Sequence, residues 1–209
     1  FMPPKFQSAE FWKWIEKYRC TWFSVVPTLL SALLHKTSLS MEQRKRLGSH
    51  LRFGRSASAP LSPEVHHQFE KKFGVPVIET MGLTETSSPI LSNPLPPGRI
   101  KYGSPGIAWG NEVRIVDGEL RTVSNGTEGE IAVRGDNVMK GYFKNPDVTR
   151  ETLREGWLLT GDIGVMDEDG YVFVRGRTKE LIIKGGENIA PREIDEALYE
   201  HGKVVEAAA

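Results

Sequence analysis

The chain has 209 residues, of which 39% are hydrophobic and 26% are charged, values that are ordinary for a soluble globular protein. Lys and Arg together number 27, and Asp and Glu also number 27, so the net charge is zero. This balance provides no broad basic surface for phosphates and therefore disfavours a nucleic-acid partner.

Cysteine usage and hydropathy predict a cytoplasmic protein. Cys20 is the only cysteine, so neither an internal disulfide nor a cysteine-rich metal site can form. The longest apolar stretches, within residues 22–34, are interrupted by polar residues and are too short for a membrane span. The first residues show no secretion signal. The basic run at residues 44–46 is typical of a solvated surface.

Helix and strand signals alternate in the first third of the chain. Ser8 and Ser62 are the expected N-caps of two helices, and Gly74 follows the end of the second. His66 and His67 lie on that polar helix, where we expect them at the surface. In chain order the patterns predict a helix at 9–15, strand 21–26, helix 28–34, strand 51–56, helix 63–73 and strand 75–79. This order predicts a parallel α/β sheet.

The sequence changes character from Ser92 onward, where prolines and glycines exclude long helices. The remaining patterns predict strands at 112–116, 119–122, 129–133, from 157 and at 171–174, helices at 147–153 and 191–200, and a strand beginning at Val204. The acidic run at 167–169 ends in Gly170, which favours a hairpin turn over a cation site. We therefore expect a small β-rich, barrel-like unit here.

The segment at residues 79–86, Glu-Thr-Met-Gly-Leu-Thr-Glu-Thr, follows a predicted buried strand. Ligands of open α/β sheets bind beyond the carboxyl ends of strands. Gly82 permits close backbone approach, Thr84 offers a hydroxyl to a phosphate, and Glu85 offers hard oxygen atoms to a magnesium ion. The same residues equally fit a polar loop in which Thr84 and Glu85 cap the next turn.

Two later segments place polar groups beside predicted strands. At Thr160-Gly161-Asp162 a buried strand leads to a carboxylate at a tight turn, where it can accept two hydrogen bonds from the hydroxyls of a ribose. A turn with a solvated acid is the alternative. At residues 176–194, charged residues precede an apolar strand, a diglycine and a proline-initiated helix. The diglycine allows a ligand or a backbone to approach closely, or forms a simple β-turn.

In this order and spacing, the segments resemble the adenylate-forming (AMP-binding) superfamily, which includes acyl-CoA synthetases, luciferases and peptide-synthetase adenylation domains. Gly82-Leu83-Thr84-Glu85 resembles the family's Tyr-Gly-x-Thr-Glu core, and residues 160–162 match its Thr-Gly-Asp. Residues 176–179 and 185–194 resemble its hinge and the loop that follows. The Gly-Gly-Glu-Asn-Ile-x-Pro form is most similar to the acyl-CoA synthetase branch. Met81 stands where an aromatic residue is common, which puts stacking against adenine in doubt.

The resemblance implies a role for each matching position. Thr84 and Glu85 would be catalytic, with Thr84 at the α-phosphate of ATP and Glu85 at Mg²⁺, and Lys179 would be the hinge. Gly185 and Gly186 would line the coenzyme A channel. The implied ATP- and AMP-binding residues are Ser58, Ala59, Pro60, Glu79, Thr80, Met81, Gly82, Thr84, Asp162 and Arg177.

The implied fold class is α/β. Residues 1–91 would be the C-terminal part of the α/β nucleotide-binding subdomains, and 92–178 a β-barrel-like subdomain with the ribose-binding turn. Residues 179–209 would be the hinge and the beginning of a small α+β C-terminal domain. The family's phosphate loop and C-terminal catalytic lysine have no counterpart, so we expect a piece of a longer enzyme that cannot form an adenylate alone.

The implied activity is an ATP-dependent carboxylate–CoA ligase. A carboxylate attacks the α-phosphate of ATP to give an acyl-adenylate and pyrophosphate, and the thiol of coenzyme A then displaces AMP. The alternatives are a non-catalytic nucleotide-binding module and an adenylation domain that loads a carrier protein. Residues 55–59 and 92–97 look similar to ligases of oxalate and short-chain acids. The sequence leaves the acyl substrate and the oligomeric state open.

Overall fold

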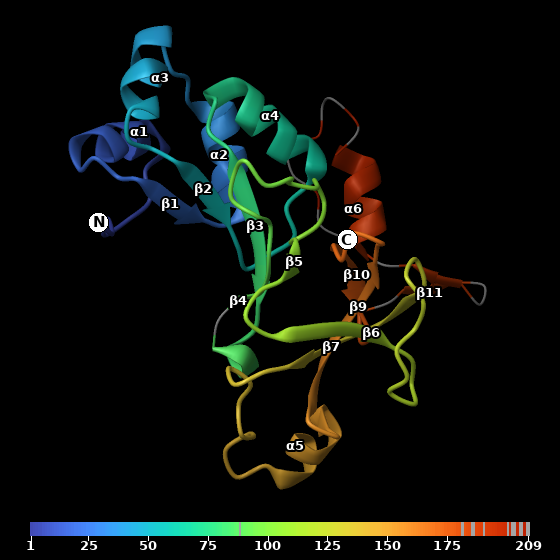
Figure 1. Cartoon of the computed structure of the whole chain (residues 1–209). Coiled ribbons are helices and arrows are strands. Elements are labelled where there is room, and N and C mark those ends of the chain that lie inside the picture. Colours follow the sequence, from blue (N-terminus) through green and yellow to red (C-terminus); the bar gives the residue numbers. More distant parts are fainter. Residues whose placement is uncertain are drawn as a thin grey trace. The chain divides into compact units, whose positions relative to one another are not determined.

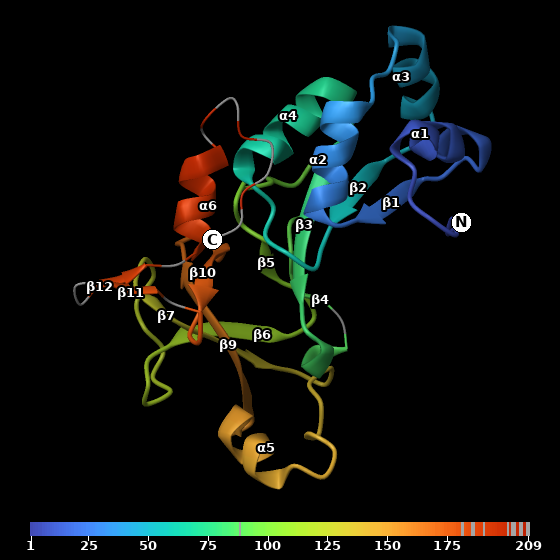
Figure 2. The same ribbon diagram turned by 180° about the vertical axis from the view of Figure 1, so that it is seen from behind.

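The computed structural model describes residues 1–87, 89–180, 182–184, 187–189, 191–199, 201, 204 and 207. The chain forms two compact units. Unit 1 comprises Phe1–Glu79 and Pro94–Gly103, and unit 2 comprises Thr80–Asn93 and Ser104–Ala209. Figures 1 and 2 show their elements from two sides. The expected boundaries of three sequence domains stay predictions.

Unit 1 is built on parallel strands with helical connections, as the alternating signals predict. Strands β1 (Trp22–Val25), β2 (Phe53–Ser56) and the first part of β3 (Val77–Gly82) pair in parallel in that order. Parallel strands require crossover connections, and here the crossovers contain helices. The helices of this unit are α1 (Ser8–Lys17), α2 (Pro27–Lys36), α3 (Met41–Gly48) and α4 (Pro63–Phe73).

Several aromatic side chains pack together in the core of unit 1. The rings of Trp12 and Phe73 lie 4.8 Å apart, and Phe69 and Phe73 lie 4.7 Å apart. The predicted apolar face of α1 is confirmed, because Phe11, Trp12 and Ile15 are all buried. The indole N–H of Trp12 donates to the hydroxyl of Thr37 at 3.0 Å, so this large ring is buried without losing a hydrogen bond.

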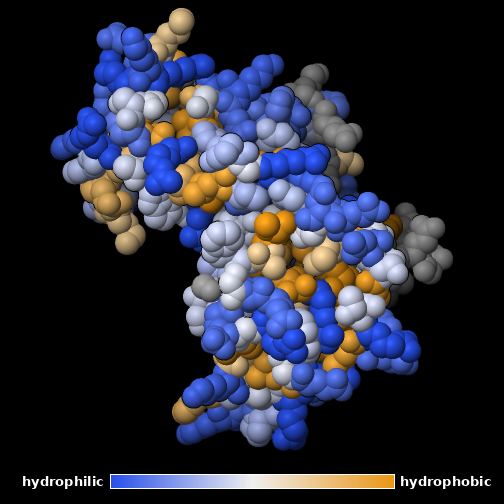
Figure 3. Space-filling view, viewed as in Figure 1, coloured by the Kyte–Doolittle hydropathy of each residue, from blue (hydrophilic) through white to orange (hydrophobic). Residues whose placement is uncertain are grey.

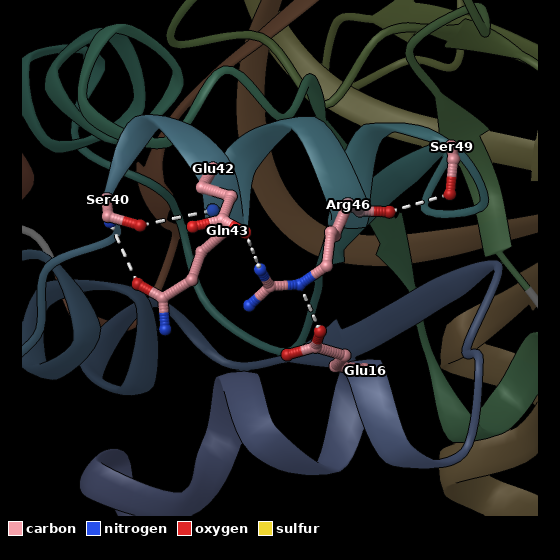
Figure 4. Close-up of polar contacts among 6 residues, drawn as sticks. All are labelled: Glu16, Ser40, Glu42, Gln43, Arg46 and Ser49. Atoms are coloured by element: carbon pink, nitrogen blue, oxygen red, sulfur yellow. Dashed lines mark hydrogen bonds and ion pairs between the residues drawn. The ribbon is translucent and has the colours of Figure 1, made fainter.

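Helix α3 was not predicted, because its sequence is almost entirely polar. Its signal is a capping box: the Ser40 hydroxyl accepts from Gln43 N–H, and the Gln43 side chain accepts from Ser40 N–H (Figure 4). Arg46 pairs with Glu16 of α1 and with Glu42 in its own helix. Residues 44–46 are all exposed, which confirms the predicted solvated surface.

Helix α4 has the predicted bounds, but its N-terminal cap differs from the prediction. Gly74 follows it in the left-handed conformation with φ of 70°, as expected, although the Ser62 side chain makes no cap hydrogen bond. Ser8 likewise lies inside α1, whose N-cap is Gln7.

His66 was expected at the surface, and that prediction was wrong. Its ring is fully buried, and Tyr102 packs edge-on against it. The buried ring keeps a hydrogen bond, since Nε2 donates to the Val77 carbonyl at 2.7 Å. Tyr102 donates to Glu70 at 2.6 Å, and this hydrogen bond raises the pKa of Tyr102 to about 12. Tyr102 thereby attaches segment 94–103 to α4, whereas His67 is exposed as predicted.

Unit 2 is mainly antiparallel. Its elements after β3 are the 3₁₀ turn Thr84–Thr86, β4 (Pro89–Ser92), β5 (Ile107–Ala108), β6 (Glu112–Val116), β7 (Glu128–Arg134), α5 (Pro146–Thr152), β8 (Leu153–Arg154), β9 (Trp157–Met166), β10 (Val172–Arg177), β11 (Ile182–Lys184), β12 (Glu187–Ile189) and α6 (Pro191–Tyr199). Strands β6, β7, β9 and β10 form one sheet in the order β10-β9-β7-β6, with β8 beside β9, while β4 pairs with the end of β3 and with β5.

Turn chemistry explains where these strands were predicted correctly. Strand β6 has the predicted bounds. Of the strand expected at 119–122, only Thr122 pairs, in a single antiparallel bridge with Val116; the residues before it form a turn, in which Leu120 N–H donates to the Asp117 carbonyl at 3.0 Å. The hairpin at 167–170 is confirmed, because Asp167 Oδ1 accepts from the N–H groups of Asp169 and Tyr171. The strand expected from Val204 falls mostly outside the described residues.

The surface agrees with the balanced composition. Hydrophilic residues cover most of the face in Figure 3, with smaller hydrophobic patches between them. Every helix in the described part of the chain is too short or too polar to cross a lipid bilayer.

Buried hydrogen bonds of the Ser104 side chain link the segment at Gly106 to β10 in unit 2. Ser104 Oγ donates to the Val172 carbonyl at 2.6 Å and accepts from Gly106 N–H at 3.0 Å. Gly106 has φ of 105°, and a Cβ atom built there would lie 2.0 Å from the Ser92 carbonyl carbon. Glycine is therefore required both by backbone conformation and by space.

We expect Gly106→Ala to destabilise the protein by more than about 3 kcal/mol, because a backbone clash adds to the strain of a positive φ. Gly126→Ala is the matched control. Gly126 has φ of 82° with no atom near the added Cβ, so only the conformational cost of about 1–2 kcal/mol remains. Urea unfolding of both variants measures the difference, and equal losses of stability would contradict the steric argument.

Candidate functional site

The 3₁₀ turn Thr84–Thr86 presents the first pair of candidate residues. Thr86 is fully buried, and its hydroxyl accepts from Leu83 N–H at 3.2 Å and donates to the Leu83 carbonyl at 3.0 Å. Thr86 rather than Thr84 or Glu85 therefore stabilises the turn, in contrast to the capping alternative. Thr84 is exposed and Glu85 is half-buried, so both side chains are available for other contacts.

A loop at residues 135–145 holds this turn. Asn137 Nδ2 donates to the Thr86 carbonyl at 3.0 Å, and Met139 N–H donates to the Glu85 carbonyl at 2.7 Å. Tyr142 Oη donates to Glu85 Oε1 at 2.8 Å. Burial, together with this bond to a carboxylate, raises the pKa of Tyr142. Tyr142 thus orients the Glu85 carboxylate by a hydrogen bond that the sequence analysis missed.

The second pair of candidate residues lies on β9 and β10. Asp162 was expected at a tight turn after a strand, but this expectation was wrong. Residues 160–162 lie inside β9 as a bulge, since all three face Ile131 of β7, between the pairs Glu130–Ile163 and Ala132–Leu159. Gly161 has φ of 74°. A bulge bends a strand and re-aims its side chains, and here it turns the backbone at Asp162.

Asp162 and Arg177 form an ion pair at the bulge. Arg177 Nε donates to Asp162 Oδ1 at 2.9 Å, and the Asp162 side chain is only 8% exposed while that of Arg177 is 52% exposed. Burial raises the pKa of Asp162, although Arg177 opposes the effect. The hydrogen bond to Asp162 in turn raises the pKa of Arg177.

The two pairs of residues are electrostatically coupled within unit 2. The negative charge of Glu85 contributes to the raised pKa of Asp162 and also to that of Arg177. The pairs are far apart in sequence, yet the fold brings them within range of each other. Glu85 is therefore within electrostatic range of Asp162 and Arg177.

Other predicted residues occupy the end of β3 and the loop after β2. Ser58, Ala59 and Pro60 are exposed, and Ser58 adopts φ of 77°, which is rare for a residue other than glycine and common at ligand sites. Glu79 is buried, and its Oε1 accepts from Leu61 N–H at 3.0 Å, which ties this loop to β3 within unit 1.

Residues 80–82 continue β3 into unit 2. Thr80 is buried, Met81 packs against the apolar cluster around Ile90, and Gly82 is exposed. Lys179 is exposed two residues after the end of β10, in a turn where Glu180 N–H donates to the Arg177 carbonyl at 3.0 Å. Gly185 and Gly186, predicted to contact coenzyme A, lie outside the described residues. In the described part of the chain, no group of three metal-binding side chains occurs.

Comparison with known proteins identifies this arrangement. The sequence profile described as AMP-binding enzyme matches residues 1–143. The chain belongs to the AMP-binding enzyme family. It is 50% identical over 209 residues to a sulfoacetate–CoA ligase of Cupriavidus necator, and 40% identical over 210 residues to an oxalate–CoA ligase of Saccharomyces cerevisiae. All of the chain is covered in both alignments, against 40% and 38% of the two relatives.

Solved structures of other proteins show the same fold as this AMP-binding enzyme chain. ATP-bound MatB from Rhodopseudomonas palustris matches with a TM-score of 0.89 at 36% identity, over 99% of this chain and 40% of that one. The o-succinylbenzoate–CoA synthetase of Bacillus subtilis with ATP and magnesium matches with a TM-score of 0.82 at 32% identity, over 98% and 41%. The expected α/β fold class and the family resemblance are confirmed. The chain spans about 40% of the length of the curated relatives it matches.

The raised pKa of Asp162 predicts a stability that depends on pH. A carboxyl whose pKa is higher in the folded state contributes most below its ordinary pKa of about 4, and this contribution is lost as pH rises through the folded value. We therefore expect Asp162→Asn to be at least as stable as wild type at pH 7. The melting temperature of wild type minus that of the variant should fall between about pH 3 and pH 7.

Thermal unfolding followed by circular dichroism measures this difference. The same change at exposed Asp136 controls for the loss of one negative charge. A melting-temperature difference that rises with pH would show that the Arg177 pair outweighs burial and would contradict the prediction.

Proposed function

We propose that the chain is the AMP-binding and hinge portion of an ATP-dependent carboxylate–CoA ligase. The supporting observation is the buried ion pair Asp162–Arg177 at the bulge of β9, together with a Glu85 carboxylate that Tyr142 orients and that contributes to the pKa of both members of the pair. One nucleotide presents both a phosphate group and a ribose with two hydroxyls. A site with hydroxyl and carboxylate groups of both pairs offers complementary partners for these two parts of one ligand.

The donor set of the turn at 84–86 suits a magnesium nucleotide. Thr84 would donate its exposed hydroxyl to the α-phosphate, and Glu85 would offer a carboxylate oxygen to Mg²⁺, a hard cation that prefers such ligands. Bound Mg²⁺ would neutralise negative charge on the phosphates during attack by the substrate carboxylate. Tyr142 holds Glu85 Oε1, which leaves Oε2 as the oxygen to turn toward the cation.

The other predicted site residues would bind the rest of the nucleotide or act in the second half-reaction. Asp162 would accept hydrogen bonds from the ribose hydroxyls, with Arg177 fixing its orientation. Ser58, Ala59 and Pro60, with residues 79–82, would flank the adenine. Lys179, exposed at the end of β10, would be the point about which the following segment turns before thioester formation. Gly185 and Gly186 would face the pantetheine arm of coenzyme A.

We propose a small carboxylic acid with a second acidic group as the substrate class. The names of two relatives, a sulfoacetate–CoA ligase and an oxalate–CoA ligase, support this class because both acids carry two negative charges. A cytoplasmic location fits the single cysteine, which needs no oxidising compartment.

The full-length protein that contains this chain should exchange pyrophosphate into ATP in the presence of its acid. We expect Glu85→Gln to lower this exchange by about 100-fold, because one charge-stabilising group for the reacting phosphate is lost. Raising Mg²⁺ should recover part of the activity. Glu168→Gln, a matched change at an exposed turn, should leave exchange unchanged.

A panel of oxalate, sulfoacetate, malonate, acetate and octanoate identifies the substrate. Thioester formation is then measured with coenzyme A and with a phosphopantetheinyl carrier protein. Exchange without transfer to coenzyme A would support the carrier-loading alternative instead. Absence of exchange with every acid would contradict the ligase proposal, and full exchange by Glu85→Gln would contradict the role of Glu85.

A further inference from the structure

We propose that Glu130 is a positioning residue that sets the geometry of the nucleotide site by holding the bulge that carries Asp162. Glu130 lies on β7, and its Oε1 accepts a hydrogen bond from Gly161 N–H at 2.8 Å. The inference rests on the proposed role of Asp162 at a ribose. It assigns a task to a half-buried acid that would not itself touch the ligand.

The bulge creates the need for such a residue. Strand β9 places three residues opposite Ile131, where an ordinary antiparallel pair places one. The ladder is therefore interrupted beside Gly161, and its N–H group meets a side chain of β7 in place of a backbone carbonyl. Partly buried N–H groups need an acceptor, and Glu130 supplies it from the strand next to the bulge.

Both sides of the Gly161 residue are held by hydrogen bonds. While Glu130 binds the N–H, the carbonyl of Gly161 accepts from Thr178 N–H at 2.9 Å and from the Thr178 hydroxyl at 3.1 Å. Glu130 belongs to β7 and Thr178 follows β10, so the strands on either side of β9 fix this one residue. Rotation of Gly161 would move the backbone of Asp162, the next residue.

The rest of the bulge is fixed independently of Glu130. Thr160 Oγ1 donates to the Ile131 carbonyl at 2.8 Å and accepts from Asp162 N–H at 3.1 Å. Arg177 holds the carboxylate itself. Loss of Glu130 should therefore leave β9 folded and Asp162 paired, but allow Gly161 and the direction of Asp162 to vary.

The bond requires an acceptor oxygen rather than a negative charge. Glu130→Gln keeps an oxygen at the same position, whereas Glu130→Ala removes it. Glu128 begins the same strand with an exposed side chain, so Glu128→Ala is the matched control for loss of a glutamate from β7.

The test compares AMP with 2′,3′-dideoxy-AMP, which lacks both ribose hydroxyls, in calorimetric titrations of the 209-residue chain. Wild type, Glu130→Gln and Glu128→Ala should bind AMP at least about tenfold more tightly than the dideoxy analogue, since hydrogen bonds to a charged group are lost. Glu130→Ala should bind AMP about tenfold more weakly than wild type and should no longer distinguish the two nucleotides. A general loss of protein stability would instead weaken the binding of both nucleotides by the same factor.

A second measurement reports on the hydrogen bond itself. In chains labelled with ¹⁵N-glycine, the Gly161 amide should be protected from hydrogen exchange in wild type, Glu130→Gln and Glu128→Ala, because the acceptor oxygen remains, and should lose protection in Glu130→Ala.

The outcomes separate this inference from the proposed function. A wild-type chain that binds neither nucleotide, or binds both equally, would contradict the nucleotide site or the role of Asp162. A wild-type chain that prefers AMP, together with an alanine variant that keeps the same preference, would overturn only the role of Glu130. A Gly161 amide that exchanges equally fast in wild type and Glu130→Ala would also overturn it.

Discussion

The site depends on keeping one ionised carboxylate where water is nearly excluded. Transfer of a carboxylate from water into a protein costs several kcal/mol unless hydrogen bonds and an opposite charge offset it. Asp162 has one guanidinium partner, and burial still raises its pKa. A neutral side chain would be less costly here, and this cost is consistent with the ligand-binding role that we propose for the acid.

Hydrogen bonds from several elements of unit 2 hold Asp162 and the turn at 84–86 in place. Strand β10 brings Arg177, β7 brings the acceptor for the bulge, and the loop at 135–145 holds the neighbouring turn at 84–86 through three hydrogen bonds. Each support comes from a different strand or loop of unit 2. For the proposed nucleotide, these supports would hold two separate polar groups in fixed positions.

The sequence correctly predicted those features that depend on interactions between residues close together in the chain. The bounds of α4 and β6, the glycine after α4 and the Asp167 turn follow from capping, periodicity and turn chemistry. The bulge in β9 and the burial of His66 could not be predicted this way, because Ile131 and Tyr102 act from distant parts of the chain. The candidate residues were found as motifs, while Tyr142, 57 residues from its partner Glu85, has meaning only after folding.

The path of the chain between the two units has a practical consequence. The backbone passes from one unit to the other after Glu79, after Asn93 and after Gly103. Unit 1 is consequently discontinuous, and a gene fragment ending at residue 79 would lack Tyr102. His66 would lose the ring that covers it, and Glu70 would lose a hydrogen-bond donor. Neither unit can be cut out as one uninterrupted stretch, so domain exchange between relatives requires several matched junctions.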